Sequence, residues 1–444
     1  MKINDDLLNM KKYRKKLKQN KIINNKNHIL FFNKNKLNLL LHFIFIINII
    51  SFVFSQETKF NKKRNLESVY SEITIITSGI GIQQILRDGF KPIPYYLEVN
   101  SMEMPFNYTI NNTKDNNKII MKFDNRITSC ENMFYGLSNI IQINMSNFDF
   151  TEITSMKGMF YGAKRLSNLL LNTKNKISKI RNLDSVFYGC NDLQSVELSM
   201  FDTSLVTDMS NMFRECYKLK NLNISHFNTA LVKNMQYMFF DCSLLPSLDL
   251  NNFDTSSVTK MASMFSGCYQ LQSLNLMNFK TNLINDMNSM FLNCNSLTSL
   301  NLISFNTSLV KNMSSLFRGC ISIEKLDLSH FNTSLVEDMS NMFNGCTEVT
   351  EFDLIKFNTS RVNNMEYMFG SCYRLTSLNI DNFDTSLVTN IKYMFYECFS
   401  LKDLNINNFN TSLVNNIQNL FSGCKSLLSI DLSNFSTSLV NNKE

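Results

Sequence analysis

The chain has 444 residues, of which 44 are basic and 37 acidic, and it contains 37 phenylalanines, 25 methionines and no tryptophan. Its net charge of +7 comes from the N-terminus, because residues 1–36 hold 11 basic and 2 acidic residues. The rest of the chain is close to neutral, which excludes a broad basic surface for nucleic acid.

The basic N-terminal segment leads into an apolar run from Leu39 to Phe54. The run ends at Ser55, and polar residues follow from Gln56. A basic flank, an apolar core and a small final residue are typical of a secretory signal peptide. We therefore predict that residues 1–55 are a basic leader and signal peptide. An uncleaved signal anchor and a buried strand are the alternatives, and the run is short for a membrane span.

Residues 56–126 do not follow the pattern that fills the rest of the chain. Short apolar stretches between proline and asparagine-rich turns predict strands at Ser71–Thr77, Tyr95–Val99, Asn107–Ile110 and Lys118–Phe123. The region is small and polar, so we expect a β-rich N-terminal cap rather than an enzyme domain. Asn107 and Asn111 begin Asn-x-Thr sequences, which makes them candidate N-glycosylation sites if the chain is secreted.

Residues 127–444 repeat one unit of 26 residues, and a fixed period of this size predicts a solenoid of about 12 rungs. Alternating apolar residues such as Leu248, Leu250 and Phe253 indicate a strand in the first half of each rung. Apolar residues three and four apart, such as Met209 and Met212, indicate a short helix in the second half. Asp/Asn-Thr-Ser between the halves favours a turn. The predicted fold is an α/β repeat solenoid, with the strands in one parallel sheet.

The repeat frame is seen in the block SLDLNNFDTSSVTKMASMFSGC, from Ser247 to Cys268. This frame resembles the BspA-like leucine-rich repeat surface proteins with 26-residue repeats, and the resemblance covers about 70% of the chain. It implies a surface or secreted protein that binds other molecules, and it implies no particular ligand and no catalytic residue.

The last rung begins with Leu432, Phe435 and Val440, and the sequence stops at Glu444. An open solenoid end needs a polar cap. We therefore expect the solenoid to be incomplete at its C-terminus. A membrane association would come only through the signal anchor or through a C-terminal segment that follows this sequence.

Cysteine recurs in the second half of ten successive rungs, on the same face as Met and Phe, whereas the first rungs have Leu137 and Ala163 at this position. We expect a ladder of buried, reduced thiols there, with disulfides between rungs as the alternative in an oxidising compartment. No Cys-x-x-Cys and no histidine at ligand spacing is present, so no metal or cofactor is expected. The cysteine column contains Cys190, Cys216, Cys242, Cys268, Cys294, Cys320, Cys346, Cys372, Cys398 and Cys424.

Beyond the leader, the only histidines are His226 and His330, four rungs apart. Neither stands in a motif that pairs a base with a nucleophile. We therefore predict no catalytic residues and no enzyme activity.

A second column lies between the two strand leucines and consists only of acidic and amide residues. Strand alternation points it away from the core, onto the open face. A solvated ladder and a binding face for a protein, glycan or cation both fit this pattern. The candidate binding column is Glu197, Asn223, Asp249, Asn275, Asn301, Asp327, Asp353, Asn379, Asn405 and Asp431.

Two functions fit these features. One is a non-enzymatic recognition or adhesion protein, secreted or at the cell surface, that binds protein or glycan partners along the solenoid. The other is a structural or coat protein that associates with copies of itself.

Overall fold

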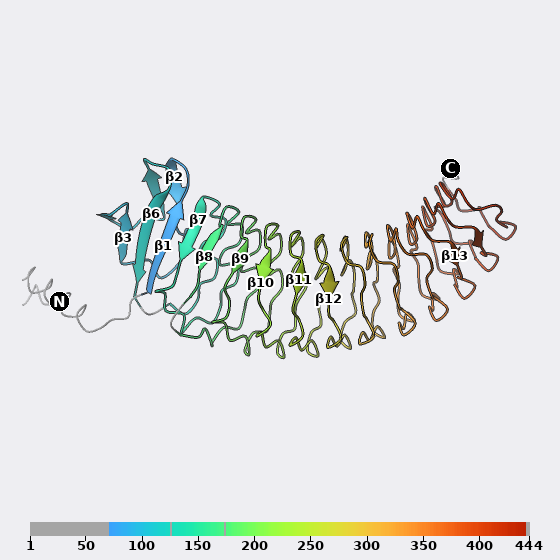
Figure 1. Cartoon of the computed structure of the whole chain (residues 1–444), viewed down its shortest axis with the longest axis horizontal. Helices are drawn as coiled ribbons and strands as arrows, with labels where there is room; N and C mark the ends of the chain where they lie inside the picture. Colours follow the sequence, from blue (N-terminus) through green and yellow to red (C-terminus); the bar gives the residue numbers. More distant parts are fainter. Residues whose placement is uncertain (1–70, 125–126, 173–174, 441–444) are drawn as a thin grey trace, which may run out of the picture. The chain divides into compact units, whose positions relative to one another are not determined.

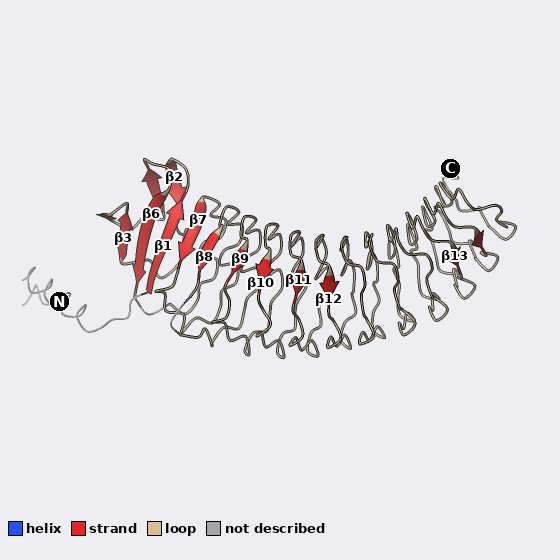
Figure 2. Ribbon diagram, viewed as in Figure 1, coloured by secondary structure: helices blue, strands red, loops and turns tan. Residues whose placement is uncertain are grey.

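The computed structural model describes residues 71–124, 127–172 and 175–440, which belong to one compact unit, Val69–Glu444. The predicted leader, signal peptide and first part of the cap lie outside these residues. The described chain consists of strands, bridges and turns (Figure 2). It contains no helix of the length and hydrophobicity needed to cross a membrane.

The cap is a β-structure that continues directly into the first rungs (Figure 1). Its six-stranded sheet has the order β4-β3-β6-β1-β7-β8. Strand β1 pairs antiparallel with β6 on one side and with β7 on the other, and β7 then pairs parallel with β8. The sheet strands are β1 (Ser71–Thr77), β3 (Tyr96–Val99), β4 (Met102–Met104), β6 (Asn117–Phe123), β7 (Ile140–Asn144) and β8 (Asn168–Leu170).

Alternation explains why these strands form where they do. In β1 the side chains of Ser71, Ile73, Ile75 and Thr77 are buried, and the intervening ones are only partly covered. The predicted strands at Ser71–Thr77 and Lys118–Phe123 are β1 and β6, and the other two predictions correspond to β3 and to β5 (Thr109–Asn112). Strand β2 (Gly81–Gln84), which pairs with β5, was not predicted because it has no alternating apolar pattern. Strand β4 was not predicted because it is only three residues long and is exposed throughout.

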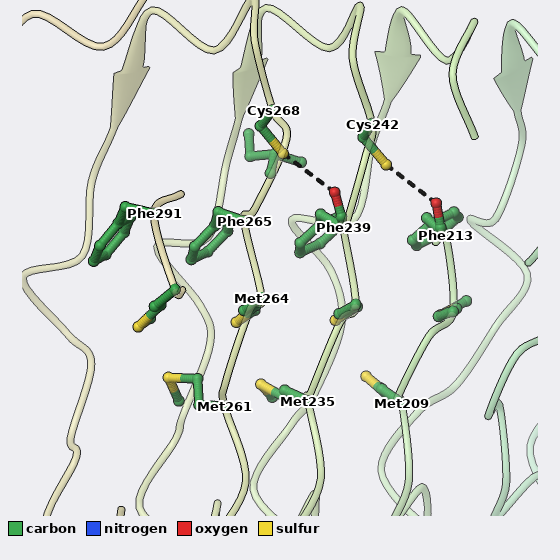
Figure 3. Close-up of a cluster of buried hydrophobic side chains, with 14 of the residues drawn as sticks. Met209, Phe213, Met235, Phe239, Cys242, Met261, Met264, Phe265, Cys268 and Phe291 are labelled. Atoms are coloured by element: carbon green, nitrogen blue, oxygen red, sulfur yellow. Dashed lines mark hydrogen bonds between the residues drawn. The ribbon is translucent and has the colours of Figure 1, made fainter. Parts of the chain in front are cut away.

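The rungs bury one continuous core in which equivalent residues stack in columns (Figure 3). The phenylalanine column runs from Phe134 to Phe421, with neighbouring rings nearly parallel and their centroids 5.4 to 6.0 Å apart. The predicted core residues, including Leu248, Met209 and Met212, are all buried. Each rung thus covers the apolar side chains of its neighbour, as a solenoid requires.

The cysteine column lies beside the phenylalanines, and all eleven cysteines are free. From Cys190 to Cys424, each Sγ donates a hydrogen bond of 3.1 to 3.3 Å to the carbonyl of the phenylalanine in the preceding rung. Burial raises the pKa of these thiols, for Cys320 to about 12 and for the half-buried Cys424 to about 11. The structure therefore favours the reduced ladder over disulfides.

The predicted short helix is wrong, because the second half of each rung is a series of turns. Within one rung the N–H of Met212 bonds to the carbonyl of Met209, three residues back, while the N–H of Phe213 bonds to Met238 of the next rung. Asn211 and Glu215 have φ of 54° and 60°, which a right-handed helix does not permit. The apolar spacing of three and four residues is real, but it reflects turns that each span three residues.

The predicted continuous parallel sheet is also only partly formed. After β8, the described strands are two residues long and occur as the parallel pairs β9–β10, β11–β12 and β13–β14. Isolated parallel bridges connect most rungs at a second position, as where Asn312 pairs with Asp286 of one neighbouring rung and with Asp338 of the other. The short strands are β9 (Ser195–Val196), β10 (Asn221–Leu222), β11 (Ser247–Leu248), β12 (Ser273–Leu274), β13 (Ser377–Leu378) and β14 (Asp403–Leu404).

A buried threonine column strengthens the contact between rungs. The hydroxyl of Thr307 donates to the carbonyl of Asn332 at 2.9 Å and accepts the N–H of Asn332 at 2.8 Å. Equivalent threonines from Thr203 to Thr411 donate to the next rung in the same way. Buried backbone groups at the turn are thereby satisfied without a strand.

We expect Met264→Asp to lower the free energy of unfolding by at least ~3 kcal/mol, because it places an unpaired carboxylate in the core. Met264 is fully buried, whereas Met277 is 59% exposed and provides the matched control Met277→Asp. Thermal unfolding followed by circular dichroism measures both. Equal melting temperatures for the two variants would contradict the observed burial.

We expect the native thiols to react slowly with a thiol reagent at pH 8, because their raised pKa keeps them protonated. Cys424 should react first, since it alone is incompletely buried. Denaturation without reductant should release all eleven. Fewer reactive thiols in the denatured chain would show that disulfides form.

Candidate functional site

All ten members of the candidate binding column are exposed on the surface, as predicted. Each lies between two apolar residues of its rung, such as Leu248 and Leu250 around Asp249, which are buried in the core; in the last rung Leu432, which follows Asp431, is 43% exposed. Rung-to-rung pairing at Ser247 and Ser273 keeps consecutive members in line. The structure therefore brings the column together along one face.

Every member of the column also has a structural role that strand alternation did not reveal. Its side-chain oxygen accepts a hydrogen bond from the backbone N–H two residues later, at 2.8 to 3.4 Å. This is an Asx turn, which only a short acid or amide side chain forms readily, with Glu197 as a longer substitute. The restriction of the column to acids and amides was the feature of the sequence that could have indicated this turn. Turn formation thus explains the residue type without any ligand.

The turn uses one oxygen of each side chain and leaves the other polar atom available. In some rungs that atom bonds to the neighbour, as when Asn275 Nδ2 donates to Asn251 Oδ1 at 2.7 Å and Asn405 Nδ2 donates to Asp381 Oδ1 at 2.8 Å. In the candidate binding column, Asp327 is followed directly by a second acid one rung later, with no amide between them. The second acid is Asp353, so Asp327 and Asp353 place two negative charges in adjacent rungs of the column.

Hydrogen bonds hold several column carboxylates in the charged form. Bonds from Ser199 and from Ser329 lower the pKa of Glu197 and of Asp327, and the backbone N–H of Ser433 lowers that of Asp431. These groups are therefore ionised at neutral pH and remain so in mild acid.

The surface along the column is shallow. A hollow of about 440 Å³ lies over β9, β10 and the start of β11, and it brings Glu197 and Asn223 together with Lys220 and Pro246. Its polar groups are spread over three rungs. Such a surface suits an extended partner better than a small enclosed ligand.

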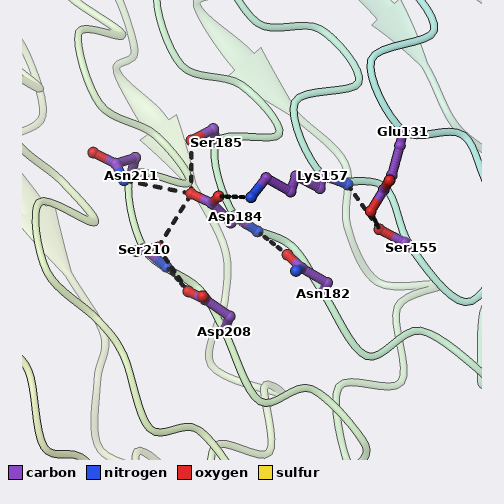
Figure 4. Close-up of polar contacts among 9 residues, drawn as sticks. All are labelled: Glu131, Ser155, Lys157, Asn182, Asp184, Ser185, Asp208, Ser210 and Asn211. Carbon is purple, nitrogen blue, oxygen red and sulfur yellow. Dashed lines mark hydrogen bonds and ion pairs between the residues drawn. The ribbon is translucent and has the colours of Figure 1, made fainter.

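Asp184 forms a second polar centre, on which several groups converge (Figure 4). Lys157 Nζ lies 3.1 Å from Asp184 Oδ2, while Ser185 and Ser210 donate to Asp184 Oδ1 at 2.7 and 3.1 Å. The bond to Asp184 raises the pKa of Lys157. The carboxylate is thus satisfied by the protein itself, and the cluster serves to connect rungs.

The two histidines that the structure describes have structural positions. His226 Nε2 lies 3.0 Å from the carbonyl of Leu198, and His330 Nε2 lies 2.8 Å from that of Leu302, in each case reaching the preceding rung. Among the residues that the structure describes, no group of three or more His, Cys, Asp or Glu is arranged to hold a metal ion.

The candidate glycosylation sites Asn107 and Asn111 are exposed in the cap, and Asn111 lies in β5. Other Asn-x-Ser/Thr sequences recur within the repeat, at Asn306 and Asn332 for example. There the Asn side chain accepts the N–H two residues later at 3.0 Å. These asparagines form turns, so their recurrence does not itself indicate glycosylation.

Comparison with solved structures found distant likenesses. A TLR13–ssRNA13 complex gives 19% identity, a TM-score of 0.25, and coverage of 57% of this chain and 39% of that one. The functional domain of InlJ from Listeria monocytogenes, which includes a cysteine ladder, gives 16% identity, a TM-score of 0.17, and coverage of 68% and 67%. The chain spans well under half the length of the first of these. No curated protein matches the sequence.

A family model described as "Mycoplasma protein of unknown function, DUF285" matches residues 98–195, 181–299, 268–377 and 372–444. These overlapping matches extend from the cap through the whole repeat region and cover well over half of the chain. The protein therefore belongs to the DUF285 family of repeat proteins.

Proposed function

We propose that this protein is a non-enzymatic recognition or adhesion module that binds a macromolecular partner along the candidate binding column. The observation that carries the proposal is the column itself, in which exposed acids and amides follow each other rung after rung with one polar atom of each left over by its turn. Because the turns fix these side chains, a partner would lose little entropy in ordering them.

The residues beside the column supply variation on a constant frame. Ser247 and Asn251 flank it in one rung, and Lys325 and Ser329 flank it in another. An extended protein or glycan partner would contact several rungs at once, so that weak contacts add up to useful affinity. The spacing of the rungs then selects partners that present groups at a similar interval.

A secreted or cell-surface location belongs to the same proposal. It is supported by the sequence of residues 1–55 and by the likeness of the repeat frame to BspA-like surface proteins. Glycosylation at Asn107 and Asn111 would follow from secretion in a cell that performs it. Labelling of intact cells with a membrane-impermeant reagent tests the location, and protection of the protein in intact but not in lysed cells would overturn it.

The double variant Asp327→Asn, Asp353→Asn tests the binding column. Asparagine occupies the same column in other rungs and can accept the same turn hydrogen bond, so stability should be retained while two negative charges are lost. Binding is measured by surface plasmon resonance on immobilised extracellular glycoproteins and polysaccharides. We expect at least one surface to bind, and the variant to weaken that binding by about fivefold or more.

The matched control is Glu152→Gln, Glu337→Gln, which changes the net charge equally at exposed positions outside the column. It should change the affinity by less than about twofold, as exposed substitutions away from a binding site usually do. If the control weakens binding and the column variant does not, the partner binds elsewhere on the solenoid.

A further inference from the structure

Tyrosine in the repeat region is confined to one part of the rung. Every tyrosine after residue 126 lies within two residues of a buried phenylalanine or of a cysteine of the ladder, and each is at least partly exposed. Because equivalent residues of successive rungs stack, two tyrosines at the same position of adjacent rungs are brought together. The tyrosines are Tyr135, Tyr161, Tyr188, Tyr217, Tyr237, Tyr269, Tyr367, Tyr373, Tyr393 and Tyr396.

Two pairs of these tyrosines stack face to face. The ring centroids of Tyr135 and Tyr161 lie 4.4 Å apart with an angle of 6° between the ring planes, and those of Tyr367 and Tyr393 lie 4.4 Å apart with an angle of 10°. The members of each pair occupy the same position of their rungs, so their side chains run in the same direction. The ring carbons next to the two hydroxyl groups therefore face each other.

The contacts around the first pair isolate it from other tyrosines. The ring of Tyr188 lies at the same 4.4 Å from Tyr161 but is inclined by 73°. Its hydroxyl donates to Glu215 Oε1 at 3.0 Å, which holds the ring in this tilted position. The guanidinium of Arg87 lies 4.4 Å from the ring centroid of Tyr135. Since Tyr161 covers one face of Tyr135, Arg87 covers the other, and Tyr161 is the tyrosine that Tyr135 meets face to face.

We propose that Tyr135–Tyr161 and Tyr367–Tyr393 are sites of oxidative coupling, at which a dityrosine bond joins adjacent rungs. Oxidation removes one electron and one proton from each hydroxyl, and the two phenoxyl radicals join through ring carbons next to the oxygen atoms. Each of these carbons then loses its proton while its ring oxygen gains one, which restores both aromatic rings. The oxidant is hydrogen peroxide acting through a peroxidase, and it takes up the two electrons and two protons to form two molecules of water.

The orientation of the rings favours these two pairs over the others. The unpaired electron of a phenoxyl radical occupies orbitals perpendicular to the ring, so the new bond begins to form between ring faces. A stacked pair is already held in this arrangement, which replaces a random encounter by a fixed proximity. In the tilted pair Tyr161–Tyr188 an edge meets a face instead. The similar stack of Tyr373 and Phe399, at 4.9 Å and 18°, cannot couple because phenylalanine forms no phenoxyl radical.

A coupled pair connects two rungs covalently without using the thiols of the cysteine ladder. The bond closes a loop in the unfolded chain and so restricts its conformations, as a disulfide does. Unlike a disulfide, it is not broken by a reductant. The first site lies where Arg87 of the cap contacts the rungs, so coupling would reinforce that end of the solenoid. The proposal does not depend on the candidate binding column, and either can fail alone.

The test treats the folded full chain with a haem peroxidase and hydrogen peroxide, isolates the monomer and digests it with trypsin. Cleavage after Lys157 and Arg181 places Tyr135, Tyr161 and Tyr188 on different peptides, which mass spectrometry then identifies. We expect a cross-linked product that joins the peptides of Tyr135 and Tyr161 and has lost two hydrogen atoms. Coupling of Tyr161 to Tyr188 in equal amount would overturn the proposal, because distance without stacking would then suffice.

Variants show whether the stacked pair forms this product. Tyr135→Phe should abolish it, whereas the matched control Tyr188→Phe should retain it. Phenylalanine already occupies the same position at Phe240, so both variants should fold. Unfolding the wild-type chain in urea before oxidation should also abolish the product, since the stack is then lost. A product that survives unfolding, or that survives Tyr135→Phe, would contradict the proposal.

The second pair needs variants for its assignment, because Tyr393 and Tyr396 share one tryptic peptide. Tyr393→Phe should remove the cross-link to Tyr367. Tyr396→Phe should retain it, because the ring of Tyr396 lies 6.2 Å from that of Tyr367 and is inclined by 75°. The opposite result would assign the cross-link to the tilted pair and would overturn the proposal for this site.

Discussion

The structure depends on one constraint, which is that the backbone polar groups of each rung find their partners in the next rung. In the second half of a rung, alternate N–H groups such as those of Asn211 and Phe213 bond across to the next rung, and the others close turns within their own. Buried N–H and C=O groups cannot be left unpaired. The bonding therefore keeps equivalent positions of successive rungs in step. Where one extra residue separates Phe160 from Phe187, the two rings still stack and the N–H groups of Phe160 and Gly162 still bond to the next rung.

Polar side chains extend this arrangement at the corners of the rung. Asp249, Asp254 and Asp286 represent three columns, each accepting a backbone N–H two residues later. At each corner, side-chain oxygens of these columns accept backbone N–H groups that a strand or helix would pair with backbone carbonyls in another fold. The polar surface is thus a by-product of turn formation, and the candidate binding column uses atoms that the turns leave free.

Much of the fold could be predicted from the sequence, because a period of 26 residues specifies a solenoid and its columns. The buried positions of Met209, Phe213 and Cys216 followed from that period alone. A helix was predicted wrongly because turns that span three residues place apolar side chains on one side almost as a helix does. The left-handed φ of Asn211 and Glu215 is what distinguishes the series of turns from a helix. Neither residue type indicates this φ in the sequence, because asparagine and glutamate also occur in helices. For the candidate binding column, the exposure of the side chains was predictable from strand alternation. The Asx turns could be recognised only once the structure showed where the backbone N–H two residues later lies.

Stacking through neighbours has a consequence for the evolution of this protein. A rung contacts the one before and the one after, through identical columns of phenylalanine, cysteine and threonine. Duplicating or deleting a whole unit therefore recreates the same contacts, with no compensating change elsewhere in the chain. Recombination between repeats can lengthen or shorten the candidate binding column in discrete steps, and so adjust the reach of the molecule without redesigning its core.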